Sequence, residues 1–212
     1  MKKLFVTGSI VLVSTSIYAA FPNPPFEKAA GKGQLATTVF AGGCFWGIEG
    51  VFESLKGVKK AVAGYAGGNA STAKYEIVST GTTGHAESVQ VTYDPSVISY
   101  GTLLKVFFSI AHDPTELNFQ GPDHGSQYRS VIFYATDEQK KIAENYILIL
   151  SKSKIYHGSI VTAVTPLKGF FPAEDYHQHY MKEHPDEPYI QAWDLPKLEA
   201  LRKTYPELVM GR

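Results

Sequence analysis

The chain has 212 residues, of which 44% are hydrophobic and 19% are charged, and this is the composition of an ordinary globular protein. Such a length allows one domain with a sizeable core, and the composition excludes a disordered or fibrous chain. The 20 basic residues balance the 20 acidic ones, so charge gives no reason to expect nucleic acid or an anionic membrane surface as a partner.

The first residues have the features of a secretory signal peptide. Lys2 and Lys3 form a basic start, an apolar stretch diluted by Ser and Thr follows, and the expected cleavage comes after Ala19. An uncleaved anchor is the alternative, but the apolar run is short and polar for a membrane span. We therefore predict a signal peptide at residues 1–19, which makes the protein periplasmic or secreted, with no stable membrane association after cleavage.

The rest of the chain divides into a lead-in and one folded domain. Residues 20–34 are rich in Pro, Gly and Lys, and this predicts a flexible segment. Periodic hydrophobic patterns begin near Leu35 and continue without an internal repeat. We therefore predict a single domain at residues 35–212.

Strand and helix patterns alternate along this domain, separated by loops rich in Gly, Ser, Thr or Pro at 67–83 and 112–125. Their order predicts a two-layer α+β sandwich of the split-βαβ (ferredoxin-like) type, with extra loops and C-terminal helices. A capping box of Thr136 and Gln139 marks the start of the third helix. The predicted strands are 36–42, 58–65, 89–93, 131–135 and 159–164, and the predicted helices are 44–56, 103–111 and the one that begins after Thr136.

The only cysteine, Cys44, lies where the first strand meets the first helix, in the segment Gly42-Gly43-Cys44-Phe45-Trp46-Gly47. Unpaired N–H groups at a helix N-terminus favour an anion, so we expect a lowered thiol pKa. A single cysteine is more often an inert core residue. The two glycines leave this sulfur uncovered, however, and Phe45 and Trp46 add an apolar wall beside it. These neighbours favour a reactive thiolate next to a small hydrophobic pocket.

Polar side chains stand beside glycines where the later strands begin or end. Tyr65 follows the second strand, Glu87 opens the third, and Asp123 and Tyr128 precede the fourth. Each of these residues alone is more often a packing or solvated side chain. Together with Cys44 they supply the thiolate, acid and phenol groups needed to attack an atom that bears a polar oxygen, and loops held on a sheet are where such sites are usually built.

Five segments in this order resemble the A-type peptide methionine sulfoxide reductase family. The similarity runs from about residue 37 to residue 180, so it covers the predicted domain and makes it a single catalytic domain. It implies an α+β fold and reduction of the S epimer of methionine sulfoxide, free or in proteins. The five segments are Gly43-Cys44-Phe45-Trp46-Gly47, Gly64-Tyr65-Ala66-Gly67-Gly68, Gly84-His85-Ala86-Glu87, Asp123-His124-Gly125-Ser126-Gln127-Tyr128-Arg129-Ser130 and Ala173-Glu174-Asp175-Tyr176-His177-Gln178.

The chemistry of a sulfoxide assigns roles to these residues. Its sulfur is a poor electrophile until its oxygen is protonated, so a protonated Glu87 would donate that proton. Tyr65 and Tyr128 would hold the oxygen by hydrogen bonds. Cys44 would then attack the sulfur, methionine would leave, and the cysteine would become a sulfenic acid.

The remaining candidate residues would bind or support the substrate. Phe45 and Trp46 would hold the S-methyl group, and Asp123 would support the site by orienting water or Glu87. The histidines of the last segments, His177, His179 and His184, do not have the spacing of a metal site, so we expect no metal.

The chain departs from many members of the family because it has no second cysteine. An outside thiol must therefore reduce the sulfenic acid, either a small thiol or an exported thioredoxin- or glutaredoxin-like protein, and no other cofactor is expected. The expected role is repair of oxidised exported proteins. Three alternatives remain open at this point: a peroxidase that uses the same thiolate, a non-catalytic module that binds oxidised methionine, and the same fold with an altered substrate range.

Overall fold

The computed structural model describes residues 21–25 and 33–211. The predicted signal peptide therefore lies outside the described residues. Within the part of the chain that the structure describes, no helix is both long and apolar enough to cross a membrane.

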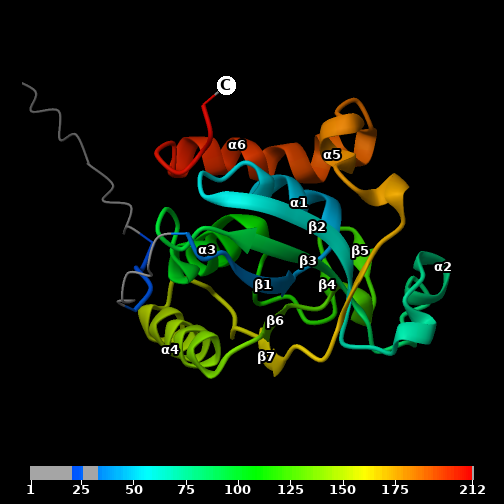
Figure 1. Cartoon of the computed structure of the whole chain (residues 1–212), viewed down its shortest axis with the longest axis horizontal. Helices are drawn as coiled ribbons and strands as arrows, with labels where there is room; N and C mark the ends of the chain where they lie inside the picture. Colours follow the sequence, from blue (N-terminus) through cyan, green and yellow to red (C-terminus); the bar gives the residue numbers. More distant parts are fainter. Residues whose placement is uncertain (1–20, 26–32, 212) are drawn as a thin grey trace, which may run out of the picture.

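Six strands form the central sheet, in the order β7-β6-β1-β3-β2-β8 (Figure 1). Strand β3 pairs antiparallel with both β1 and β2, so those two run parallel on either side of it. Strand β6 is antiparallel to β1, and only the edge strand β7 pairs in parallel. The bounds are β1 Ala36–Ala41, β2 Val58–Ala66, β3 Ala86–Tyr93, β6 Val131–Tyr134, β7 Ala163–Pro166 and β8 Phe170–Pro172, and a separate hairpin joins β4 Phe119–Gln120 to β5 Asp123–His124.

Helices of very different length surround this sheet. Side-chain caps begin two of them: Ser99 Oγ accepts the Thr102 N–H, and Thr136 Oγ1 accepts the Gln139 N–H. The Thr136 half of the predicted capping box is thus present, whereas Gln139 Oε1 accepts the N–H of Ala135, one residue before the cap. The bounds are α1 Phe45–Glu53, α2 Tyr75–Val78, α3 Tyr100–Val106, α4 Asp137–Ser153, α5 Tyr180–Glu183 and α6 Leu195–Thr204, with π-helical turns at Phe107–Ala111 and Ile190–Asp194.

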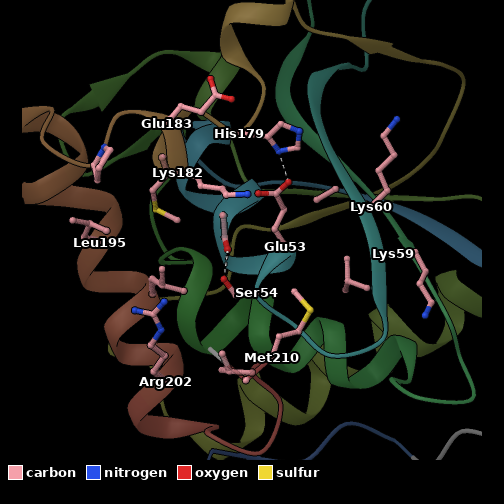
Figure 2. A pocket seen from close by; sticks show the side chains of 18 residues that line it. Glu53, Ser54, Lys59, Lys60, His179, Lys182, Glu183, Leu195, Arg202 and Met210 are labelled. Carbon is pink, nitrogen blue, oxygen red and sulfur yellow. Dashed lines mark hydrogen bonds and ion pairs between the residues drawn. The ribbon is translucent and has the colours of Figure 1, made fainter.

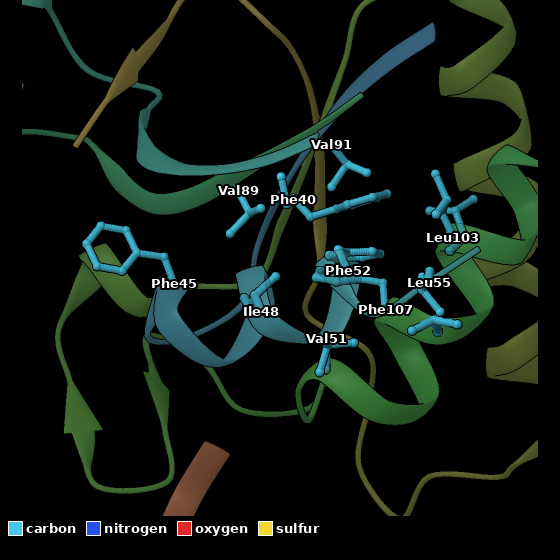
Figure 3. Close-up of a cluster of buried hydrophobic side chains, with 14 of the residues drawn as sticks. Phe40, Phe45, Ile48, Val51, Phe52, Leu55, Val89, Val91, Leu103 and Phe107 are labelled. Atoms are coloured by element: carbon cyan, nitrogen blue, oxygen red, sulfur yellow. The ribbon is translucent and has the colours of Figure 1, made fainter. Parts of the chain in front are cut away.

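The larger core lies between the sheet and helices α1, α3, α4 and α6 (Figure 3). Side chains alternate along β1, so Phe40 points into this core while Val39 and Ala41 belong to a smaller cluster on the other face. The ring of Phe40 stacks on Phe52 of α1 at 5.1 Å and on Phe107 at 4.9 Å. This aromatic stack fixes α1, and with it the position of Cys44, against the sheet.

The predicted lead-in partly contacts the fold. Phe21 packs edge-on against Tyr156 at 6.2 Å, and the Tyr146 hydroxyl donates a 2.7 Å hydrogen bond to the Pro22 carbonyl. The described residues 21–25 therefore lie against the helical layer, ahead of residue 35, where we predicted that folding begins.

The α+β class is confirmed, whereas several element predictions need correction. The loop at 67–83 contains the short helix α2, and the strand predicted at 159–164 is β7 at Ala163–Pro166. The sequence analysis missed strand β8 and the β4–β5 hairpin. These are short or edge elements whose register is set by the strand beside them, so a local pattern identifies them poorly.

We expect Phe52→Ala to lower the free energy of unfolding by about 3–5 kcal/mol, because it removes a fully buried ring from the centre of the core. Urea denaturation measures this loss. Leu148→Ala is the control, since Leu148 is 56% exposed on α4, and it should change stability by about 0.5 kcal/mol or less. Equal losses in the two variants would show that the stack on Phe40 is not central to the fold.

Candidate active site

Cys44 occupies the N-cap position of α1, directly after the turn that ends β1. Gly43 has a φ of +102°, and a Cβ there would lie 2.7 Å from the Gln120 side chain, so only glycine fits this turn. The turn places the cysteine at the start of the helix, as predicted, with 8% of its surface exposed. Most of the Cys44 side chain is therefore buried, but a small part of it remains accessible.

Glu87 lies on β3 beneath this helix start and is 2% exposed. Its Oε2 accepts a 3.1 Å hydrogen bond from the Phe45 N–H, the first amide of α1. Burial raises the pKa of Glu87 to about 8. The hydrogen bond from the Phe45 N–H lowers this pKa, whereas the charges of Asp123 and Asp194 raise it further. At neutral pH Glu87 therefore carries a proton, as an acid catalyst must.

The expectation of a lowered cysteine pKa is wrong for this site. Burial raises the pKa of the Cys44 thiol well above its ordinary value, and the charges of Glu87 and Asp194 add to this. The Trp46 amide and Lys197 oppose the shift. Desolvation of the thiolate thus outweighs the helix terminus, and the resting site holds a proton on both the thiol and the carboxyl group.

The structure places the predicted site residue Tyr65 against Glu174. Its side chain is fully buried, and its hydroxyl donates a 2.8 Å hydrogen bond to Glu174 Oε2. Its ring lies 5.9 Å from the ring of Phe45. The Tyr65 hydroxyl therefore already has an acceptor, and its ring packs beside the aromatic wall.

Two other phenols share the surroundings of Cys44 and Glu87. Tyr128 is half-buried, and burial raises its pKa together with the charges of Glu87, Asp123 and Cys44. Burial likewise raises the pKa of Tyr75, again with contributions from Glu87 and Cys44. Neither hydroxyl has a hydrogen-bond partner among the described residues, so both can serve a ligand.

The sequence analysis missed Tyr75. It is the only aromatic residue of the long loop at 67–83, which was the one available signal. Its position depends on Glu174, whose Oε1 accepts the Tyr75 N–H at 3.0 Å while Oε2 accepts the Tyr65 hydroxyl. One carboxylate therefore fixes both tyrosines, the first by its backbone and the second by its side chain.

The predicted aromatic wall is present and is larger than expected. Trp46 stacks on Tyr180 at 3.9 Å, and its Nε1–H donates to His177 Nδ1 at 3.3 Å. The ring of His177 lies 5.0 Å from Phe45 and 4.5 Å from Tyr75. Asp123 accepts a hydrogen bond from the hydroxyl of Tyr189, whose ring lies edge-on to Trp46 at 5.9 Å.

An ion pair from the C-terminal segment also approaches Cys44. Asp194 is fully buried and pairs with Lys197 Nζ at 3.1 Å. It packs against Gly47 of α1 so closely that any side chain at position 47 would collide with its carboxyl group. Nothing in the local sequence marked Asp194 or Lys197, because their role depends on α6 packing beside α1.

A pocket of about 760 Å³ lies along α1, β2 and α6, away from Cys44 and Glu87 (Figure 2). None of the predicted site residues lines it. Beside it, side-chain atoms of Glu49, Glu53 and His179 lie within 4.8 Å of one another. Both oxygens of Glu49 already accept backbone N–H groups, from Ala63 at 3.3 Å and from His179 at 2.8 Å. This cluster therefore fastens α1 to β2 and to the turn before α5.

Comparison with known proteins agrees with this geometry. A model of the family described as peptide methionine sulfoxide reductase matches residues 36–208. The chain is 56% identical over 182 residues to peptide methionine sulfoxide reductase MsrA 2 of Mesorhizobium japonicum, with 86% of this chain and 92% of the relative covered. The chain belongs to this family. It is therefore a peptide methionine sulfoxide reductase enzyme.

Other relatives support the assignment. The corresponding MsrA 2 of Synechocystis is 52% identical over 185 residues, covering 87% of this chain and 85% of the relative. Methionine sulfoxide reductase A of Corynebacterium diphtheriae has a similar structure, with a TM-score of 0.63, 34% identity, and 77% and 82% of the two chains covered. Reduced Mxr1 from Saccharomyces cerevisiae gives a TM-score of 0.61 and 36% identity, with 72% and 87% covered.

We expect Glu87→Gln to lower the pKa of Cys44 in this enzyme. Above about pH 8 the wild-type Glu87 is ionised and its charge disfavours the thiolate, and the amide removes that charge. The pH dependence of Cys44 alkylation by iodoacetamide measures the shift. Glu144→Gln on exposed α4 changes the net charge equally and should leave the midpoint unchanged. An unchanged or higher midpoint in Glu87→Gln would contradict the coupling.

Proposed function

We propose that this enzyme uses thiols to reduce the S epimer of methionine sulfoxide, free or in proteins, through a sulfenic acid on Cys44. The observation that carries the proposal is the buried Glu87 carboxyl, protonated up to about pH 8 and hydrogen-bonded to the amide that follows Cys44. A proton donor next to the only thiol is what oxygen removal from a sulfoxide requires.

Substrate binding follows from the shape of the site. The S-methyl group packs on Phe45 and Trp46, which places the sulfoxide sulfur beside Cys44. The oxygen then faces Glu87, with Tyr75 and Tyr128 as the two phenols whose hydroxyls lack a partner within the described residues. We assign to Tyr75 the oxygen-binding role that the sequence analysis gave to Tyr65.

The reaction transfers one oxygen atom between two sulfur atoms. Glu87 donates its proton to the sulfoxide oxygen, the Cys44 sulfur attacks the substrate sulfur, and the thiol proton goes to the Glu87 carboxylate. The oxygen then bonds to the Cys44 sulfur while the new sulfur–sulfur bond and the sulfur–oxygen bond of the substrate break, so that methionine leaves and Cys44 becomes a sulfenic acid. Phenolic hydrogen bonds that shorten as charge develops on the oxygen lower the barrier.

An external thiol completes the cycle, because the chain has no second cysteine. Attack of a thiol on the sulfenic acid releases water and forms a mixed disulfide, and a second thiol restores Cys44. We propose a small thiol or a thioredoxin- or glutaredoxin-like protein as this reductant. The two thiols supply both electrons of the cycle, so the reaction needs no other cofactor.

The cellular role rests on the N-terminal sequence. A signal peptide at residues 1–19 would place the enzyme in the periplasm or outside the cell, where it would repair oxidised exported proteins. We also propose that its scaffold is an elaborated split-βαβ sandwich, and the pairing of β3 between β1 and β2 supports this description.

We expect the protein to consume only the S epimer from a mixture of both methionine sulfoxide epimers with dithiothreitol, and Cys44→Ser to consume neither. Chiral chromatography follows each epimer. Loss of the R epimer, or turnover by Cys44→Ser, would overturn the proposal. Consumption of hydrogen peroxide but of neither epimer would favour the peroxidase alternative.

We expect Trp46→Ala to lower kcat/KM for methionine sulfoxide by about 10- to 200-fold, since a lost methyl contact is worth roughly 1–3 kcal/mol. Steady-state assays with the S epimer measure this loss, and a thermal melt shows whether the variant is folded. The control is the rate of Cys44 alkylation by iodoacetamide, which needs no methyl pocket and should not fall in parallel. A parallel fall would mean that Trp46 acts on Cys44 and not on the substrate.

A further inference from the structure

A cleft in the described structure reaches Cys44. This cleft of about 250 Å³ is lined by Cys44, the loop after the Phe107–Ala111 turn, the β4–β5 hairpin and the segment that leads into α6. Glu87, Tyr75 and Tyr128 do not line this cleft, nor do Phe45 and Trp46. Apart from Asp123, and Tyr189 at the edge of Trp46, it therefore reaches the sulfur past residues other than those predicted to bind the substrate.

The second half of the proposed reaction restricts the direction from which a thiol can attack Cys44. A thiol that attacks a sulfenic acid approaches along the extension of the sulfur–oxygen bond, because the oxygen is the leaving group. The first half-reaction leaves that oxygen next to Glu87 and the two phenols. The attacking sulfur must consequently come from the side of Cys44 away from Glu87.

The cleft walls carry more negative than positive charge. Asp113, Glu116 and Asp123 line it, whereas its only cation in the described structure, Lys197, is already paired with Asp194. His112 also lines the cleft, and burial lowers its pKa to about 4, so it is neutral at pH 7.

We propose that this cleft is the route by which the reducing thiol reaches Cys44, and that its carboxylates select uncharged or cationic thiols against anionic ones. The proposal rests on the sulfenic acid mechanism proposed above. In the step itself, the incoming sulfur bonds to Cys44 Sγ while the sulfur–oxygen bond breaks. Glu87 protonates the departing oxygen to give water, and the thiol proton replaces it on Glu87. Cys44 is thereby reduced to a mixed disulfide as the thiol is oxidised.

Two half-reactions, measured separately, test this route. The enzyme first reacts with methionine sulfoxide without thiol, and the methionine released per Cys44 reports the first half. Excess substrate is then removed, and three thiols of the same skeleton reduce the sulfenic acid: cysteamine, 2-mercaptoethanol and 2-mercaptoethanesulfonate. Loss of labelling by dimedone follows the second half.

The variant Glu116→Gln keeps an acceptor for the Gly121 N–H and removes one charge from the cleft. We expect this variant to increase the rate of reduction by 2-mercaptoethanesulfonate about two- to fivefold and to decrease the rate with cysteamine by a similar factor. One charge several ångströms away has an effect of this size in a partly screened site. The uncharged thiol and the methionine release should stay as in the wild type. Comparing each thiol with itself cancels intrinsic differences in thiol reactivity.

Asp113→Asn also removes one negative charge, so it should change the thiol rates in the same direction. It keeps the side-chain oxygen that accepts the Thr115 N–H. Glu144→Gln on α4 is the matched control and should change no rate. If wild-type enzyme releases no methionine, the proposed function fails. If methionine is released normally and the cleft variants leave all three thiol rates unchanged, or change them equally, the cleft is not the route.

The same assay separates small thiols from a protein source. Trp193 lines the cleft and is 45% exposed, so a protein reductant that inserts its cysteine would contact the indole. With a thioredoxin-like protein, Trp193→Ala then slows the second half-reaction while the small thiols are not slowed. If neither Trp193→Ala nor Glu116→Gln changes the rate of reduction by the thioredoxin-like protein, while Glu116→Gln changes the rates with the charged small thiols, the cleft serves small thiols alone.

Discussion

The hydrogen bond between the Phe45 amide and the Glu87 carboxyl group holds the active site together. It joins the start of α1 to strand β3 at the residue next to Cys44, in surroundings from which water is largely excluded. Loss of solvation, stronger than the stabilising effect of this bond on the charged form, keeps the carboxyl protonated to about pH 8. The proton donation that we propose depends on this protonated carboxyl group, and the charge of an ionised Glu87 adds to the effect of burial on the Cys44 pKa.

Other carboxylates in the same region behave differently because their partners differ. Burial works against ionisation of Glu174, but hydrogen bonds from the Tyr75 amide and the Tyr65 hydroxyl lower its pKa on balance. Burial raises the pKa of Glu49 to about 7, yet both of its oxygens accept backbone N–H groups that tie α1 to its neighbours. Glutamate thus supplies the proton donor that we propose, an anchor for two tyrosines and a structural tie.

The C-terminal segment contributes to the site although it contains no thiol. Tyr189 donates to Asp123, and the buried pair of Asp194 and Lys197 lies close enough to Cys44 to influence its pKa. In the proposed cycle, the single cysteine makes the reaction depend on an outside thiol. The same C-terminal segment forms one wall of the cleft through which, in our proposal, that reductant arrives.

Local sequence alone determined the features that depend on neighbours in the chain. The glycine turn, Cys44 at the start of a helix, the aromatic pair after it and the capping box of α4 were all predicted, because short-range sterics and periodicity specify them. The importance of Glu87 could also be inferred from its motif. Tertiary structure decided which tyrosines are free: Tyr65 and Tyr75 are distinguished by contacts with Glu174, which lies 109 and 99 residues away. It also reversed the expected pKa shift of Cys44, since desolvation and the charge of Asp194 come from elements that meet only in the folded chain.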